Sequence, residues 1–95
     1  MDYDWDEAKR LLNYDKHGVD FSEAINFEWD VALVTMHKRY DYGEKRFLAY
    51  APIGSRLYAM TFTLRKARKR IISLRKSNLR ELKHYVEQIK TNSSD

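Results

Sequence analysis

The sequence has no cysteine, one proline and three glycines among its 95 residues. Without cysteine, the chain cannot form a disulfide scaffold, use a thiol nucleophile or bind zinc through thiolates. The scarcity of proline and glycine argues against a disordered or low-complexity chain. No apolar run approaches the length of a membrane-spanning helix. We therefore expect a single folded domain over residues 1–90, a polar tail over residues 91–95 and no membrane segment.

Common catalytic motifs are also missing. The sequence contains no glycine-rich phosphate loop and no G-x-S-x-G turn, which argues against nucleotide-cofactor and serine-hydrolase chemistry. The three histidines, His17, His37 and His84, do not have a spacing that predicts a metal site. We expect neither a metal nor a cofactor. Because the first residues lack the basic stretch and apolar run of a signal peptide, we expect a cytoplasmic protein.

Charge is unevenly distributed along the chain, whose formal net charge is +4. Residues 1–30 carry 9 acidic and 3 basic side chains, whereas residues 61–95 carry 3 acidic and 10 basic ones. A basic C-terminal half is typical of a protein that binds a polyanion, most simply nucleic acid. A solvated surface of lysine and arginine explains the same charge, so charge alone leaves both interpretations open.

The N-terminal third predicts two helices. The first covers residues 5–17, with Asp4 and Glu7 as a capping box and Gly18 just past its end. Its apolar stripe is formed by Ala8, Leu11 and Leu12, whereas Lys9, Asn13 and Lys16 share a different face. A second, short helix follows Asp20 and ends near residues 29–30.

The rest of the chain predicts four strands and a final helix. The strands cover residues 32–40, 45–51, 56–65 and 68–75, with turns at residues 41–44, 52–55 and 66–67. In the last strand, alternation places Ile72 and Leu74 on one face and Ile71, Ser73 and Arg75 on the other. The final helix covers residues 78–90, with Asn78 and Glu81 as a capping box. This order predicts an α+β fold with a four-stranded, mainly antiparallel sheet.

Arginines near strand ends are the main candidates for chemistry. A guanidinium group matches two phosphate oxygens and keeps its charge, so Arg65 and Arg75 suit a phosphodiester substrate. If the last two strands form a hairpin, Arg65 lies near the turn and Arg75 near the far end. Arg65, Arg70 and Arg75 could each have a structural role instead of binding phosphate. They would then be solvated charges on the strand surface or form ion pairs with the acidic N-terminal third. Internal ion pairs that turn Arg65 and Arg75 away from any groove would contradict a role on phosphate.

Aromatic residues make up 14% of the chain. Exposed aromatic rings beside cations suit base stacking, although core packing is the commoner use of such rings. Trp5 lies one turn before Lys9, so its ring either stacks on a base or packs against the start of the first helix.

Several spaced motifs together resemble the BrnT family of bacterial toxins over roughly residues 3–87. They are Trp5-Asp6-Glu7-Ala8-Lys9, Asn13, Lys16-His17-Gly18-Val19, Phe21, Glu23-Ala24, Gly43-Glu44, Arg46, Gly54, Arg56, Thr63, Arg65, Arg70-Ile71-Ile72-Ser73, Arg75-Lys76, Glu81 and Tyr85. The resemblance implies a RelE-like fold and a ribonuclease toxin of a type II toxin–antitoxin pair. It also implies a BrnA-like antitoxin that neutralises the toxin and carries the DNA-binding element, in complexes with two copies of each protein.

The resemblance further implies roles for individual residues. Arg65 and Arg75 would stabilise charge on the phosphate, followed by Lys9 and His17 from the first helix. Glu44 would act as general base. Bases and backbone of the RNA would be bound by Trp5, Arg46, Arg56 and Arg70. For His17 and Glu44, the structural roles of helix C-terminal residue and turn acceptor stay open beside catalysis.

The leading hypothesis is thus an endoribonuclease that cleaves RNA without a metal, by attack of the 2′-hydroxyl. Two alternatives stay open: a non-catalytic nucleic-acid-binding or regulatory subunit, and a protein-interaction module whose cations face an acidic partner. Strand scission distinguishes the endoribonuclease from the non-catalytic nucleic-acid-binding subunit, since both would bind RNA. RNA binding at low salt would argue against the protein-interaction module.

Overall fold

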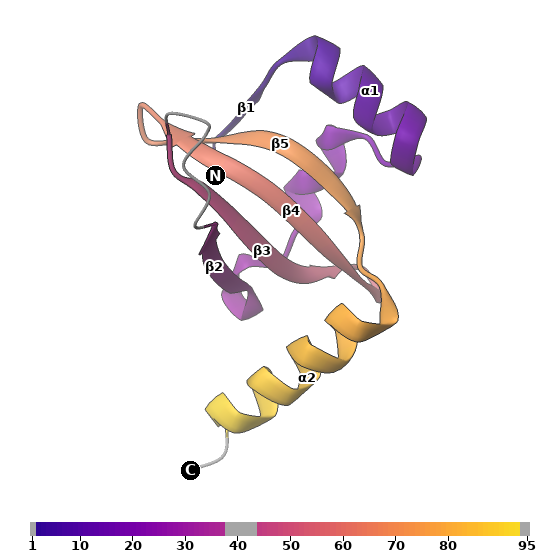
Figure 1. Ribbon diagram of the computed structural model, residues 1–95, viewed down its shortest axis with the longest axis vertical. Helices are drawn as coiled ribbons and strands as arrows, with labels where there is room; N and C mark the ends of the chain where they lie inside the picture. Colours follow the sequence, from indigo (N-terminus) through magenta and orange to yellow (C-terminus); the bar gives the residue numbers. More distant parts are fainter. Residues whose placement is uncertain (1, 38–43, 94–95) are drawn as a thin grey trace.

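A computed structural model describes residues 2–37 and 44–93 (Figure 1). Its elements, in chain order, are β1 (Tyr3–Trp5), α1 (Glu7–His17), the 3₁₀ helices η1 (Phe21–Asn26) and η2 (Trp29–Val31), β2 (Leu33–His37), β3 (Arg46–Ile53), β4 (Arg56–Arg65), β5 (Arg68–Lys76) and α2 (Leu79–Ser93). The strands form one sheet in the order β1-β5-β4-β3-β2. β1 runs parallel to β5 and the other pairs are antiparallel. The α+β class is confirmed.

The prediction of four strands is wrong, because the sheet has a fifth strand at its edge. β1 has only three residues, Tyr3–Trp5, and pairs with the first half of β5, placing Asp4 opposite Arg70. A segment that short carries no alternation signal, and its partner lies some 65 residues further along the chain. Helix α1 consequently begins at Glu7 instead of residue 5. Its N-cap is Asp6, which accepts a hydrogen bond from the Ala8 N–H at 2.8 Å.

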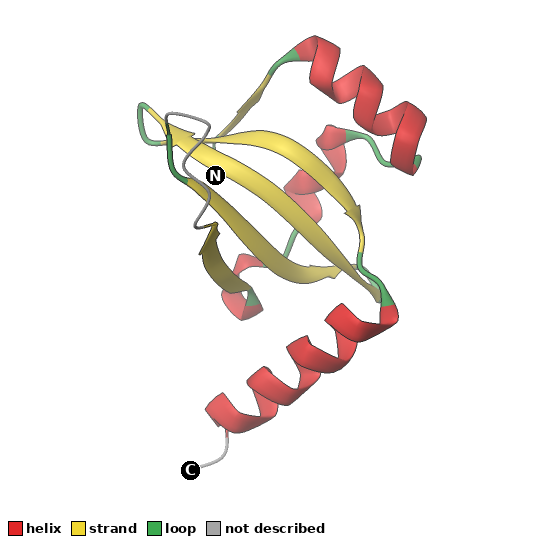
Figure 2. Ribbon diagram, viewed as in Figure 1, coloured by secondary structure: helices red, strands yellow, loops and turns green. Residues whose placement is uncertain are grey.

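The second N-terminal helix also differs from the prediction. Asp20 caps it as expected, accepting from the Ser22 N–H at 3.0 Å, but the six residues that follow form a 3₁₀ helix rather than an α-helix. A second 3₁₀ turn, η2, precedes β2. Figure 2 shows these short helices behind the sheet in that view. Their side chains Phe21, Ala24 and Phe27 form a hydrophobic core with strand residues, notably Met60 and Leu74.

A β-bulge changes which side chains of β5 face the core. Phe62 of β4 pairs with Ile71, but the next pair is Thr61 with Ser73, so the register skips Ile72. Ile71 and Leu74 therefore lie in the same core, both fully buried, and the predicted grouping of Ile72 with Leu74 is wrong. A bulge re-aims side chains and increases local twist, and this one leaves Ile72 beside α1.

The C-terminal helix begins as predicted. The Asn78 side chain accepts from the Glu81 N–H at 2.8 Å, and the Glu81 carboxylate accepts from the Asn78 N–H at 2.9 Å, which completes the capping box. The helix continues to Ser93, beyond the expected end. Tyr85 packs with Tyr50, Leu57 and Ala59 in a second, smaller core on the sheet. One turn further along α2, Ile89 packs against the same core, and the helix then continues toward the C-terminal end of the chain (Figure 1).

The turns of the predicted hairpins have different outcomes. The turn expected at residues 41–44 lies outside the described residues, apart from Glu44. Between β4 and β5, Arg65 pairs with Arg68, so Lys66 and Ala67 form a two-residue loop. Both have positive φ angles, of 51° and 65°. This is the hairpin geometry that favours Gly and Asn, and a side chain there costs about 1–2 kcal/mol.

Replacing Ala67 with glycine is therefore expected to stabilise the protein. The substitution removes the steric penalty of the Cβ, partly offset by the greater freedom of glycine in the unfolded chain. We expect the free energy of unfolding to rise by about 0.5–1 kcal/mol, measured by urea denaturation. Ala8→Gly, in the exposed first turn of α1, is the matched control and should destabilise. Equal destabilisation by both substitutions would contradict the proposed strain.

Candidate active site between α1 and β5

A single buried amide fixes helix α1 to the sheet. The Asn13 side chain, 6% exposed, donates to the Leu74 and Val19 carbonyls at 2.8 and 3.0 Å and accepts from the Leu74 N–H at 3.1 Å. β1 pairs with β5 only over Lys69–Ile71, so Asn13 bonds the edge of β5 where β1 no longer covers it. Helix α1 therefore packs along this part of β5, with the Asn13 side chain between them.

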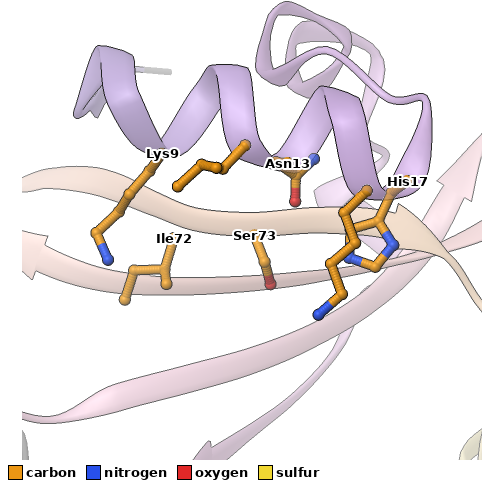
Figure 3. A pocket seen from close by; sticks show the side chains of 7 residues that line it. Lys9, Asn13, His17, Ile72 and Ser73 are labelled. Atoms are coloured by element: carbon orange, nitrogen blue, oxygen red, sulfur yellow. The ribbon is translucent and has the colours of Figure 1, made fainter.

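This arrangement forms a groove of about 190 Å³ between the helix and the strand. Its lining comprises Lys9, Leu12, Asn13, Lys16, His17, Ile72 and Ser73. Figure 3 shows Lys9 near one end and His17 near the other, with Ile72 and Ser73 below them on the strand. Two of the predicted catalytic residues, Lys9 and His17, are thus brought together, because they lie two helical turns apart on the face that also carries Asn13.

The predicted apolar stripe of α1 does not form the contact with the sheet. Leu11 and Leu12 are 57% and 69% exposed, and Ala8 is exposed as well. The helix instead turns its polar side toward β5, because Asn13 satisfies backbone groups of β5 that have no strand partner. A helix that exposes leucines and buries an asparagine presents an apolar surface next to a cationic groove.

His17 occupies the last turn of α1, where Gly18 ends the helix with a φ of 71° and donates to the Tyr14 carbonyl at 2.8 Å. Burial lowers the pKa of the His17 imidazole below 6.5, and the charges of Lys16 and Arg75 lower it further. The helix dipole acts in the opposite direction, since it favours a cation at this position. At neutral pH the ring is therefore uncharged and able to accept a proton.

Arg75 follows Ser73 on β5 and is held by α2. Its Nη1 and Nη2 atoms donate to the two carboxylate oxygens of Glu81, each at 2.8 Å. Glu81 also accepts from the Tyr50 hydroxyl at 3.0 Å. The Arg75 guanidinium, with the capping-box and Tyr50 hydrogen bonds, lowers the pKa of Glu81 to about 2. Arg75 is therefore in an internal ion pair, yet its charge still acts on His17.

Arg65 and Glu44 lie at the opposite end of the hairpin. Arg75 pairs with Ala59 and Arg65 with Arg68, so about six residues of β4, roughly 20 Å, separate the two arginines. Arg65 forms a salt bridge with Glu44 at 3.0 Å, and the Thr63 hydroxyl donates to the same carboxylate at 3.1 Å. These contacts lower the pKa of Glu44, which makes it a poor proton acceptor. Glu44 and Arg65 do not line the α1–β5 groove.

The four residues predicted to bind RNA are dispersed. Trp5 packs its ring edge-on against Phe21 at a centroid distance of 6.0 Å, next to the core. Arg46 lies opposite His37 at the start of β3, and Arg56 borders a hollow near the start of α2. Arg70 forms a salt bridge with Asp4 at 2.7 Å. None of the four lines the α1–β5 groove.

Three residues that line or support this site are not among the predicted site residues. Asn13 had a signal, since it shares a helical face with Lys9 and Lys16. Glu81 had one in its capping box, although its bond to Arg75 depends on the tertiary fold. Ser73 belongs to the Arg70-Ile71-Ile72-Ser73 motif, but its position beside Ile72 in the groove depends on the bulge, which has no local signal.

Glu81→Gln is expected to reduce stability in a pH-dependent manner. The pKa of Glu81 is lower in the folded than in the unfolded protein, so its stabilisation is present above about pH 4.5 and is lost as pH falls toward 2. The glutamine variant should be less stable by about 1–3 kcal/mol at pH 7, with the difference shrinking below pH 4. Denaturation of both proteins from pH 2 to 7 measures it. Glu87→Gln, on the exposed side of α2, is the control, and a pH-independent difference for Glu81→Gln would refute the assignment.

The fold and the groove define a small α+β protein in which the first helix and the edge of the sheet hold a neutral histidine among cations. A family model described as ribonuclease toxin, BrnT, of type II toxin-antitoxin system matches residues 5–81, and the chain belongs to this family. It is accordingly a ribonuclease toxin of a type II system, whose partner is an antitoxin. No individual curated protein matches the chain. Among the described helices, none is long and apolar enough to cross a membrane.

Proposed function

We propose that the α1–β5 groove cleaves RNA by attack of a 2′-hydroxyl on the adjacent phosphorus, without a metal ion. The observation that carries this proposal is a neutral imidazole, His17, lining the same groove as two lysines. A neutral imidazole accepts the proton of the attacking hydroxyl, and neighbouring cations stabilise the charge that develops on the phosphoryl oxygens.

The proposed reaction forms one bond to phosphorus and breaks another. His17 takes the 2′-hydroxyl proton as the bond from O2′ to phosphorus forms. The bond from phosphorus to the 5′-oxygen breaks, and that oxygen takes a proton from the ammonium group of Lys9 or Lys16. The products are a 2′,3′-cyclic phosphate and a 5′-hydroxyl end. Arg75 does not line the groove and is paired with Glu81, so its part is limited to helping lower the pKa of the His17 imidazole.

The same geometry supports neutralisation by a BrnA-like antitoxin. Leu11 and Leu12 present an exposed apolar surface on α1, and Leu12 also lines the groove. Exposed apolar side chains next to a site are typical of a protein interface. An antitoxin that buries these leucines would cover the groove and exclude RNA. Complexes with two copies of each protein, binding DNA only through the antitoxin, belong to the same proposal.

A cleavage assay with a random-sequence RNA pool and excess EDTA tests the proposed function. We expect cleavage, with 2′,3′-cyclic phosphate ends identified by mass spectrometry. A pool in which every 2′-hydroxyl is methylated should stay intact, because the nucleophile is absent. Cleavage that requires added divalent metal, or that leaves 3′-hydroxyl ends, would refute the mechanism. Binding without scission would favour a non-catalytic nucleic-acid-binding subunit.

A further inference from the structure

A second cationic hollow lies at the tip of the β4–β5 hairpin. It has a volume of about 400 Å³ and is lined by Asp4, Arg65, Lys66, Arg68 and Arg70. The α1–β5 groove shares none of these residues. Among the described residues, four of the five lining side chains are cations, and they come from the hairpin and from both of its strands.

The cations outnumber the acids that hold them. Asp4 bonds Arg70 at 2.7 Å, and Glu44 bonds Arg65 at 3.0 Å from outside the hollow. Within the part of the chain that the structure describes, counting both acids against the four cations leaves two positive charges. Lys66 and Arg68, at the tip, are exposed. The carboxylate of Asp4 stays ionised, because the hydrogen bond and charge of Arg70 lower its pKa, so it holds Arg70 in place and offsets one of the positive charges.

The backbone of the same hairpin is strained. Lys66 and Ala67 both have positive φ angles, in a loop where glycine or asparagine would relieve the strain. Side chains held in sparsely populated backbone conformations cluster at functional sites. Here the strained loop keeps Lys66 beside three arginines despite their mutual repulsion.

The position of the hollow relates it to the groove. Both border the same edge of the sheet: Asp4 of β1 lines the hollow, and α1, which follows β1 directly, lines the groove. Along β5, Arg68 and Ser73 are about five residues, or roughly 16 Å, apart. A flexible single strand with a phosphate in the groove therefore reaches the hollow within a few nucleotides.

From these observations we propose that the hairpin hollow is a binding site for backbone phosphates of single-stranded RNA, apart from the phosphate that is cleaved. This inference rests on the proposed function for its substrate. Guanidinium groups bind phosphate oxygens in pairs, and such contacts position a strand without reading its sequence. The hollow thereby contributes affinity for long RNA and leaves the chemical step to the groove.

Binding of an uncleavable 12-nucleotide 2′-O-methyl RNA, followed by fluorescence anisotropy at low salt, tests the proposal. The variant Lys66→Glu/Arg68→Glu should bind at least 10-fold more weakly than the unmodified protein. Arg80→Glu/Lys83→Glu, with the same change in net charge on exposed residues of α2, is the control and should change affinity less than 3-fold. Lys66→Asn/Arg68→Gln, which suits the turn conformation, is the second variant in case charge reversal prevents folding. It should weaken binding several-fold.

The salt dependence and the substrate length give further readouts. The slope of log affinity against log salt should fall by about 1.4 in the first variant, because two phosphate contacts are lost. For cleavable RNA, kcat/KM on the 12-mer should fall at least 10-fold while cleavage of a dinucleotide is unchanged. Equal losses in the hairpin and α2 variants, or no loss in either, would overturn the proposal. If the protein binds the 2′-O-methyl RNA through the hairpin but cuts no RNA, this inference stands and the proposed function fails.

Discussion

Replacing His17 with alanine is expected to lower the rate of RNA cleavage by about 10²–10⁴-fold, the usual contribution of a positioned general base. The thermal midpoint should change little, since His17 lies at the end of the helix and does not hold α1 to the sheet. The position of α1 depends on Asn13. Single-turnover cleavage of a defined RNA measures the rate, and relief of growth arrest gives an independent readout in cells.

The pH profile distinguishes a base from a structural residue. Because burial, Lys16 and Arg75 lower the pKa of His17, the neutral form persists below pH 6.5. Cleavage should therefore decline on the acid side only below pH 6.5, as the imidazole becomes protonated, and this limb should be absent from the residual activity of the alanine variant. His84→Ala, in the exposed part of α2, serves as the control. Unchanged cleavage by His17→Ala would remove His17 from the mechanism.

Replacing Asn13 with alanine should produce the largest loss of stability. The substitution leaves the N–H and carbonyl of Leu74 and the carbonyl of Val19 without their side-chain partner. Each buried polar group left unsatisfied costs about 1–3 kcal/mol, so we expect a loss of about 3 kcal/mol or more. A domain of this size has a total stability of only about 5–14 kcal/mol. Urea denaturation, with the slope compared between variants, measures the change.

Two companion variants make the Asn13 result specific. Asn13→Asp keeps an acceptor for the Leu74 N–H but loses both donors, so it should be destabilised although its shape is unchanged. Asp15→Ala, an exposed position two residues further along α1, should change the free energy of unfolding by less than about 0.5 kcal/mol. A similar small effect of Asn13→Ala would show that the amide does not fix α1 to the sheet.

The parts of the fold that were predictable have local causes. Asp20, the Asn78–Glu81 capping box and Gly18 act within a few residues, and the structure confirms all of them. The strand from residue 56 to 65 likewise shows its alternation in the sequence. In contrast, β1 forms through a parallel contact with β5, and the position of Ile72 follows from a bulge that depends on β4. Such features arise from tertiary packing and have no local pattern.

The candidate site likewise combines residues that a local pattern predicts with contacts that only the tertiary fold creates. Lys9 and His17 were identifiable because helical periodicity places them on one face. The exposure of Leu11 and Leu12 could not be predicted, since an apolar stripe normally marks the buried side of a helix. Here the Asn13 contacts turn the other side of α1 toward the sheet. The ion pairs of Arg65 with Glu44 and of Arg75 with Glu81 also depend on tertiary contacts. Because both arginines are in ion pairs, the proposed mechanism places the proton transfer on His17 instead.

In the proposed function, RNA lies in the groove between α1 and β5. Titration of the isotope-labelled protein with 2′-O-methyl RNA, followed through backbone amide chemical shifts, locates the bound strand. We predict that the largest changes fall on residues 7–18 of α1 and residues 68–75 of β5, including Lys9, His17 and Ser73. Changes confined to β2 and α2, with α1 unaffected, would contradict the account.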